Sequence, residues 1–92
     1  MRRITLDGTR MATKEELHRE LKDKLRLPEH YGNNLDALWD CLTGEVELPI
    51  EVDWKHYGAA VQALGTYGES TAELLEEAAR QLGGRFRFSK DA

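Results

Sequence analysis

Three short segments with strand character, separated by longer segments with helical character, constrain the fold of this chain most. Residues 4–6 form the first, the alternation of Ile50, Val52 and Trp54 with acidic residues marks the second, and residues 85–89 form the third. Strands connected through helical crossovers pair in parallel. The order predicts an α/β fold in which one three-stranded parallel sheet is packed with about four helices. At 92 residues the chain is long enough for one domain, residues 1–92, and too short for two.

Capping residues mark the expected ends of the first two helices. Thr13 and Glu16 have the spacing of a capping box, in which each side chain bonds a free amide of the first turn. Asn34 is a favourable N-cap for a second helix over Leu35–Leu42, and Gly44 is its expected stop. The sequence therefore predicts a short, well-delimited second helix.

The second half of the chain predicts two more helices. A third is expected over Tyr57–Leu64. Ser70 and Glu73 repeat the capping-box spacing and predict that a fourth helix begins there. The glycine pair at 83–84 is its expected end.

Charge is distributed unevenly along the chain. The chain has 17 acidic and 13 basic residues, but between Arg26 and Lys55 lie seven acidic residues and no basic one. The formal charge of this acidic window is therefore −7, and that of the rest of the chain is +3. Such a window repels phosphate backbones, which argues against nucleic acid as a ligand, and attracts a basic partner. On charge alone, a solvated acidic surface that serves solubility is the favoured interpretation.

Helical geometry places two carboxylates of the window on one face of the second helix. At about 100° per residue, Asp36 and Asp40 share a face with Thr43 beside them, whereas the core side carries Leu35, Leu38 and Leu42. Like charges four residues apart are unfavourable, and Asp40 also lies in the last turn, where the helix dipole disfavours an acid. Two explanations stay open at this point: Asp40 pairs with a nearby Lys or Arg, or it serves a function.

The other reactive or aromatic residues have structural interpretations. Cys41 is expected to be a buried thiol, and as a single cysteine it excludes an internal disulfide and a four-cysteine zinc site. Trp54 is expected in the core and Trp39 at its boundary. His18 is expected to be a solvated surface histidine, and His56 a structural or solvated residue at a strand–helix junction.

Neither an enzyme nor a metal site is indicated. The two aspartates with Glu29 or Glu47 could supply oxygen ligands to a hard cation, but no ordered run of such ligands accompanies them. No nucleophile–base pair, phosphate loop or cofactor fingerprint is present. We therefore expect no catalytic residue, no metal and no cofactor.

No apolar run reaches the roughly 20 residues that span a bilayer, and no secretory signal follows the basic start. We therefore expect a cytoplasmic protein without membrane contact.

The segment Leu27–Gly44 closely resembles the central segment of the barstar family, inhibitors of the ribonuclease barnase. The most specific part is Tyr31-Gly32-x-Asn34-Leu35-Asp36-Ala37-Leu38-Trp39-Asp40. Weaker similarity extends over essentially the whole chain. The resemblance implies a barstar-like three-stranded parallel sheet with helices. It also implies that the second helix and the preceding loop enter the ribonuclease active site, where their acids stand in for RNA phosphates.

The resemblance also implies which residues bind the ribonuclease. By position, Asp40 matches the central acid of the family, Asp36 the second acid, and Glu77 a peripheral acid of the fourth helix. Further matching positions in or beside the contact surface are Gly32, Asn34, Trp39 and Thr43. The chain departs from the best-known member of the family at two contact positions: His30 stands where that protein has a tyrosine, and Glu45 where it has a tryptophan. The Leu48-Pro49 bond matches a position that is cis in the family, and we expect it to be cis.

The resulting expectation is a 1:1 inhibitor of a secreted-type, guanyl-specific (barnase-like) microbial ribonuclease, monomeric when free. His30 and Glu45 put the identity of the partner in question. The alternative is an acidic interaction module that keeps the fold and binds a different cationic protein or toxin. A small hydrolase or metal-binding protein is a third hypothesis, which would require activity or metal-dependent melting of the isolated chain.

Overall fold

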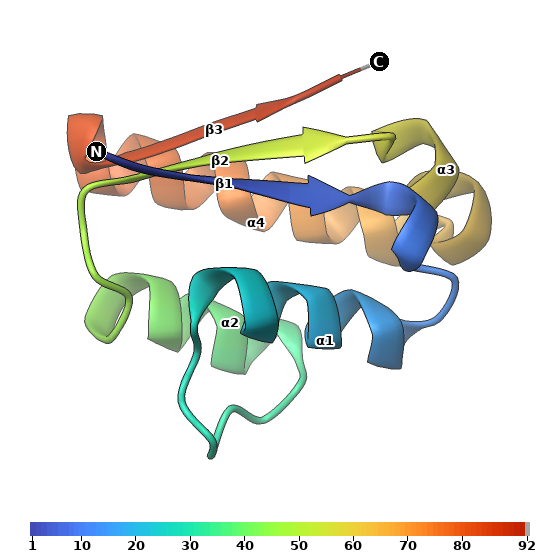
Figure 1. Cartoon of the computed structure of the whole chain (residues 1–92), viewed down its shortest axis with the longest axis horizontal. Coiled ribbons are helices and arrows are strands. Elements are labelled where there is room, and N and C mark those ends of the chain that lie inside the picture. The colour runs from blue at the N-terminus through green and yellow to red at the C-terminus, as the bar shows by residue number, and fades with distance from the viewer. Residues whose placement is uncertain (92) are drawn as a thin grey trace.

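A computed structural model describes residues 1–91 and contains three strands, four α-helices and two short 3-10 turns in the described residues (Figure 1). In chain order these elements are β1 (Arg2–Asp7), η1 (Gly8–Arg10), α1 (Lys14–Leu25), α2 (Leu35–Gly44), β2 (Ile50–Lys55), α3 (Tyr57–Leu64), α4 (Thr66–Leu82), η2 (Gly83–Arg85) and β3 (Phe86–Lys90).

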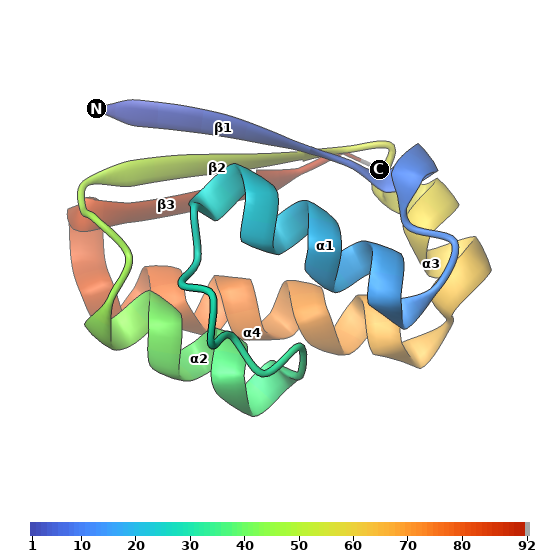
Figure 2. The ribbon, with the colours of Figure 1, turned by 60° about the horizontal axis from the view of Figure 1, so that its bottom comes forward.

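The strands form one parallel sheet in the order β1-β2-β3, which confirms the expected α/β architecture. The register places Ile4 beside Val52 and Val52 beside Phe88. Figures 1 and 2 show α1, α2 and α4 on one side of the sheet, with α3 at the end where β1 and β2 terminate. The helices therefore cover a single face.

Because only one face of the sheet is covered, buried and more exposed residues alternate along the strands. Most parallel strands lack this alternation because they are buried on both faces. Ile50, Val52 and Trp54 are completely buried, and the acidic residues between them are half-buried. On the uncovered face an ion pair joins Arg3 Nη2 to Glu51 Oε2 at 3.4 Å. The alternation seen in the sequence thus reflects a sheet with one apolar and one polar face.

The core lies between the sheet and the helices. Trp54 is its largest fully buried side chain, and its ring meets Tyr57 and Phe88 edge-on with centroids 4.9 and 6.5 Å away. Leucines from α1 and α2 pack beneath it, with fully buried side chains at Leu17, Leu21, Leu25, Leu38 and Leu42. The predicted burial of Trp54 is confirmed.

The predicted starts of the first two helices agree with the structure. Thr13 caps α1 by accepting a hydrogen bond from Glu16 N–H at 3.1 Å, and Glu16 Oε1 in turn accepts from Ala12 N–H at 2.9 Å. The second helix begins at Leu35 as predicted and continues through Gly44, two residues beyond the expected Leu42. The Leu48-Pro49 bond is cis, as expected.

The predicted start of the fourth helix is wrong. Helix α4 begins at Thr66, four residues before the expected position, directly after Gly65 with φ of +60°. Ser70 therefore lies inside the helix and is exposed, so it does not cap it. The chain turns at Gly65 because glycine tolerates positive φ, and α3 passes almost directly into α4.

Candidate protein-binding site

Helix α2 presents its acidic face to solvent. Asn34 Oδ1 accepts a hydrogen bond from Ala37 N–H at 2.7 Å and fixes the start of the helix. Leu38, Cys41 and Leu42 are buried where α2 packs against the rest of the protein, so the predicted burial of Cys41 is confirmed. Asp36 and Asp40, on the opposite side, are both exposed.

Asp40 has no partner within the described part of the chain. Among residues 1–91, no ion pair or side-chain hydrogen bond involves the carboxylate of Asp40 or Asp36. The hypothesis that Asp40 pairs with a nearby Lys or Arg is therefore wrong. In the structure the last turn of α2 comprises residues 41–44, so the prediction that Asp40 lies in that turn, against the helix dipole, is wrong. Asp40 is instead an exposed carboxylate one turn from Asp36, a like charge, and its hydrogen-bonding capacity is unused.

Two more predicted site residues lie beside Asp40. Trp39 is half-buried, as expected for a boundary residue, and packs against the core. Thr43 is exposed, and its hydroxyl donates to the Trp39 carbonyl at 2.9 Å. Because that bond uses the hydroxyl proton, the oxygen of Thr43 remains available as an acceptor.

The loop before α2 is held by one buried side chain. Tyr31 is 5% exposed, whereas His30, Gly32 and Asn33 on either side of it are exposed. Tyr31 N–H donates to the Pro28 carbonyl at 3.0 Å and closes a turn. The loop therefore presents the predicted contact residues His30 and Gly32 around a fixed aromatic anchor.

The loop passes close to the first turn of α2. Asn34 Nδ2 donates to the Gly32 carbonyl at 3.3 Å. A Cβ added at Gly32 would lie 3.3 Å from Ala37 Cβ, tighter than most real contacts. Asn33 adopts a left-handed φ of +55°, which asparagine tolerates better than most residues. Gly32 and Asn34 thus have local reasons for their positions in addition to their predicted role.

His30 and Glu45, the two residues that differ from the best-known family member, lie next to each other in the structure. His30 Nε2 lies 3.6 Å from Glu45 Oε1, and both side chains are largely exposed. Glu45 follows the last residue of α2, so this contact joins the loop to the far end of the helix. The sequence did not predict that His30 and Glu45 would be neighbours.

Glu77 is already engaged within its own helix. Its carboxylate accepts hydrogen bonds from Arg80 at 2.6 and 3.1 Å and from Gln81 at 3.2 Å. These bonds hold the pKa of Glu77 below its ordinary value. In residues 1–91 no hydrogen bond or ion pair joins Glu77 to α2. The structure thus brings His30 and Glu45 together but leaves Glu77 paired with Arg80.

The expectation that His18 is a solvated surface residue is wrong. His18 is 1% exposed and is hydrogen-bonded to the hydroxyls of Tyr31 and Tyr67. One signal in the sequence was available: His18 shares a helix face with Leu21 and Leu25, at spacings of three and seven residues. The contact with Tyr67, 49 residues away, had no signal. His56 is exposed at the β2–α3 junction, which fits its interpretation.

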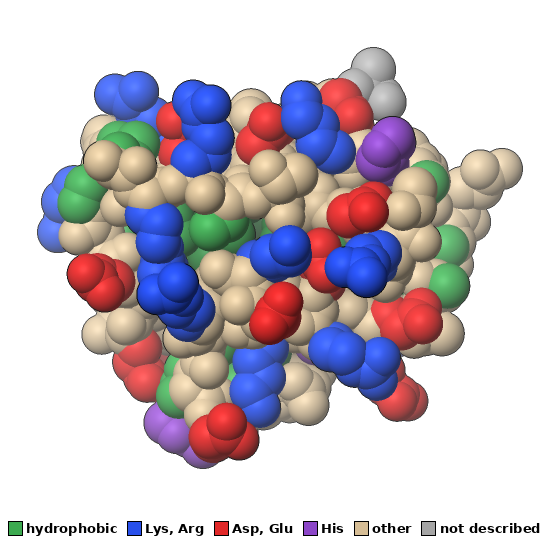
Figure 3. Space-filling view, viewed as in Figure 1, with side chains coloured by type: hydrophobic (Ala, Val, Ile, Leu, Met, Phe, Trp, Pro, Cys, Tyr) green, Lys and Arg blue, Asp and Glu red, His purple; other side chains and the backbone are tan. Residues whose placement is uncertain are grey.

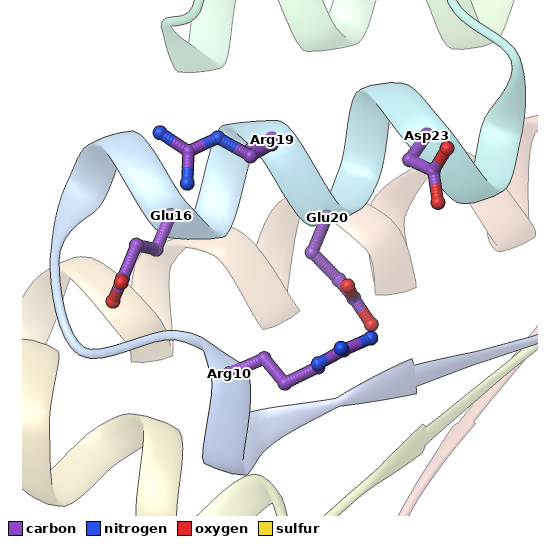
Figure 4. A pocket seen from close by; sticks show the side chains of 5 residues that line it. All are labelled: Arg10, Glu16, Arg19, Glu20 and Asp23. Carbon is purple, nitrogen blue, oxygen red and sulfur yellow. The ribbon is translucent and has the colours of Figure 1, made fainter.

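A hollow of about 510 Å³ lies away from α2, between α1 and the turn after β1 (Figure 4). Its lining is of mixed charge and comprises Arg10, Glu16, Arg19, Glu20 and Asp23. Glu20 Oε2 accepts a hydrogen bond from Asp7 N–H at 3.0 Å and so joins α1 to the end of β1. We interpret this hollow as a structural junction.

No group of three His, Cys, Asp or Glu side chains in residues 1–91 is arranged to hold a metal ion. None of the helices described is both long and apolar enough to cross a membrane.

Figure 3 shows that the face carrying β1 and α1 intersperses Lys and Arg with Asp and Glu. The basic residues of the chain thus lie outside the acidic window that contains α2.

The fold and the site define a small α/β domain that presents an exposed, unpaired acidic helix and the loop before it. Residues 1–89 match the family model described as Barstar (barnase inhibitor). The chain is also 45% identical, over 88 residues, to the Bacillus subtilis (strain 168) protein named "Putative ribonuclease inhibitor YrdF", covering 96% of this chain and 97% of that protein. The chain belongs to the barstar family. These relationships support ribonuclease inhibition as its general function and a binding role over an enzymatic one.

Proposed function

We propose that this protein is a 1:1 inhibitor of a guanyl-specific, barnase-like microbial ribonuclease, and that α2 and the loop before it occupy the enzyme's active site. RNA is polyanionic, so a ribonuclease cleft must be cationic. An exposed acidic helix complements such a cleft, which speeds association and fixes the orientation of the complex. The inhibitor itself performs no chemistry.

The carboxylate of Asp40 is the single observation that carries the proposal. In the free protein it is exposed, unpaired and one turn from Asp36, a like charge. A cationic cleft offsets this cost, because an arginine or lysine of the enzyme forms charge-assisted hydrogen bonds with it. Asp36, one turn earlier, extends the same acidic surface.

The remaining predicted contacts surround these two acids. His30, Gly32 and Asn34 supply the loop side, and Trp39 with Thr43 borders Asp40 on the helix. Glu45 and Glu77 lie at the periphery of the proposed contact. Because Arg80 already binds Glu77, a cation of the ribonuclease competes with that residue, and we assign Glu77 the smaller share of binding.

The proposal places the protein in the cytoplasm as a monomer when free, where it neutralises a ribonuclease made for secretion. The His30–Glu45 contact favours one alternative. Since both positions depart from the best-known member of the family, the alternative is an acidic module of this fold that binds a different cationic protein or toxin.

A titration of the protein into a guanyl-specific microbial ribonuclease, followed by RNA cleavage, tests the proposal. We expect activity to fall linearly and to end at one equivalent of inhibitor. A ribonuclease of unrelated fold and specificity is the control and should keep its activity. Full activity of the guanyl-specific enzyme in the presence of folded inhibitor would contradict the proposal and favour the alternative partner.

A further inference from the structure

Two hydrogen bonds through the buried ring of His18 connect α4 to the loop before α2. Tyr67 Oη lies 2.6 Å from His18 Nε2, and His18 Nδ1 lies 2.7 Å from Tyr31 Oη. The three side chains belong to three separate segments: α4, α1 and the loop. Their rings also contact one another, with centroids 5.7 Å apart for His18 and Tyr31 and 5.9 Å apart for His18 and Tyr67.

The burial of Tyr31 determines which groups donate and which accept in these two hydrogen bonds. A neutral imidazole donates through one nitrogen and accepts through the other. In the described residues Tyr31 Oη has no hydrogen-bond partner other than His18. If Tyr31 only accepted, its own buried proton would be left unpaired at a free-energy cost. Tyr31 therefore donates to Nδ1, and the proton on Nε2 is donated to Tyr67, a half-buried residue that lines a hollow of the protein.

Tyr31 is what fixes the loop to the body of the protein. Within residues 28–34 it is the only buried residue, and the others are exposed or half-buried. The proposed contact residues His30 and Gly32 are its immediate neighbours, and α2 begins shortly afterwards at Leu35. A displacement of the Tyr31 ring would therefore displace these residues together.

We propose that His18 and Tyr67 are positioning residues for the ribonuclease-binding surface, which hold its loop in the bound conformation through the hydroxyl of Tyr31. This inference rests on the proposed function. Neither residue needs to touch the partner: His18 is buried and Tyr67 lies on α4. Pre-organisation of this kind strengthens binding because less conformational freedom is lost on association.

The surroundings of His18 explain how acid would release the loop. When His18 is protonated, the added proton binds to Nδ1, which can then no longer accept the hydrogen bond from the Tyr31 hydroxyl. Burial lowers the pKa of His18, which keeps the ring neutral and both hydrogen bonds intact near neutral pH. A hollow of about 330 Å³ reaches His18 and Tyr67, and the charged groups that line it are Lys14, Glu15, Arg19 and Lys22, with Asn33 at its edge.

The first test uses the free protein and nitrogen-15 NMR of the histidine rings. We expect Nδ1 of His18 to be unprotonated and Nε2 to carry the proton. Tyr67→Phe removes the acceptor of the Nε2 proton, and this hydrogen bond is stronger from the charged ring than from the neutral one. The pKa of His18 should therefore fall further below its ordinary value. Tyr57→Phe is the matched control, since no hydrogen bond of the Tyr57 hydroxyl is seen in residues 1–91 and its ring packs on Trp54 instead. The opposite tautomer, or an unchanged His18 pKa in Tyr67→Phe, would overturn the inference.

The second test measures dissociation of the ribonuclease complex. We expect Tyr67→Phe and Tyr31→Phe each to dissociate about 2- to 10-fold faster, as for the loss of one hydrogen bond, and Tyr57→Phe to match the wild type. The double variant Tyr31→Phe with Tyr67→Phe should lose less than the product of the two single effects, because both act through one imidazole. Normal inhibition with unchanged Tyr67→Phe kinetics refutes the positioning role, whereas absence of inhibition by the wild type refutes the proposed function.

Discussion

Replacing Asp40 with asparagine should change folding stability and binding in opposite directions. The substitution keeps the shape of the side chain and removes its charge. In the free protein it relieves repulsion from Asp36, about 0.2–0.5 kcal/mol for charges four residues apart. Because Asp40 is exposed and solvent screens this repulsion, we expect the free energy of unfolding to rise by about 0.3 kcal/mol.

In the complex the same change removes charge-assisted hydrogen bonds. Such bonds contribute about 1.5–3 kcal/mol, so the dissociation constant should rise by about 10- to 150-fold. Urea unfolding and calorimetric titration into the ribonuclease measure the two quantities on the same preparation. Glu73→Gln is the matched control: it also removes one exposed negative charge, but on α4 near Tyr57, and should leave the dissociation constant within about twofold. Reduced stability together with unchanged affinity would refute the reasoning about Asp40.

Three further predictions test the electrostatics and the packing. Raising salt should slow association with the ribonuclease more than it speeds dissociation, because screening weakens long-range attraction; a salt-independent association rate in stopped-flow measurements would mean that the acidic window plays no part. Gly8→Ala should lower the free energy of unfolding by about 1–3 kcal/mol, since its Cβ would collide with the His56 carbonyl, whereas Gly84→Ala meets open space and should fold normally; equal urea midpoints for the two would contradict this. Asp91 accepts hydrogen bonds from His56 and Tyr57 N–H, both at 2.8 Å, which lower its pKa below the ordinary value. A lowered carboxyl pKa contributes stability above the unfolded-state pKa, and this stability is lost as pH falls through the folded-state pKa. The stability difference between wild type and Asp91→Ala should therefore vanish in strong acid; a constant difference would argue against a stabilising role of these two hydrogen bonds.

The parts of the fold that depend on neighbouring residues could be predicted from the sequence. Helix α2 begins at its predicted residue because Asn34 caps it locally, and the exposure of Asp36 and Asp40 follows from the rotation of one helix. The central strand was recognisable because only one face of the sheet is covered. The start of α4 could not be predicted in the same way, since a capping box at Ser70 competed with a turn at Gly65 and the turn determines the boundary.

The parts of the site that depend on tertiary contacts could not be predicted. His18 has the polarity of a surface residue, and only the hydroxyls of Tyr31 and Tyr67 make its burial favourable. The proximity of His30 to Glu45 depends on the path of the loop around α2. By contrast, the Glu77–Arg80 pair is local, three residues apart on one helix, and its spacing alone would have indicated it.

The register of the sheet has a consequence for how this protein folds. Arg2 pairs with Ile50, and Ile50 pairs with Phe86, so every strand contact joins residues that are 48 or 36 positions apart. Chain entropy must be lost to close such loops before any pairing contact forms, which slows folding relative to a helical bundle of equal length. Helix α2 and its cap, in contrast, involve only contacts three to four residues apart. We therefore expect the acidic helix to gain structure early and the sheet to be completed in the slow step, which φ-values for Asn34→Ala and Val52→Ala would measure.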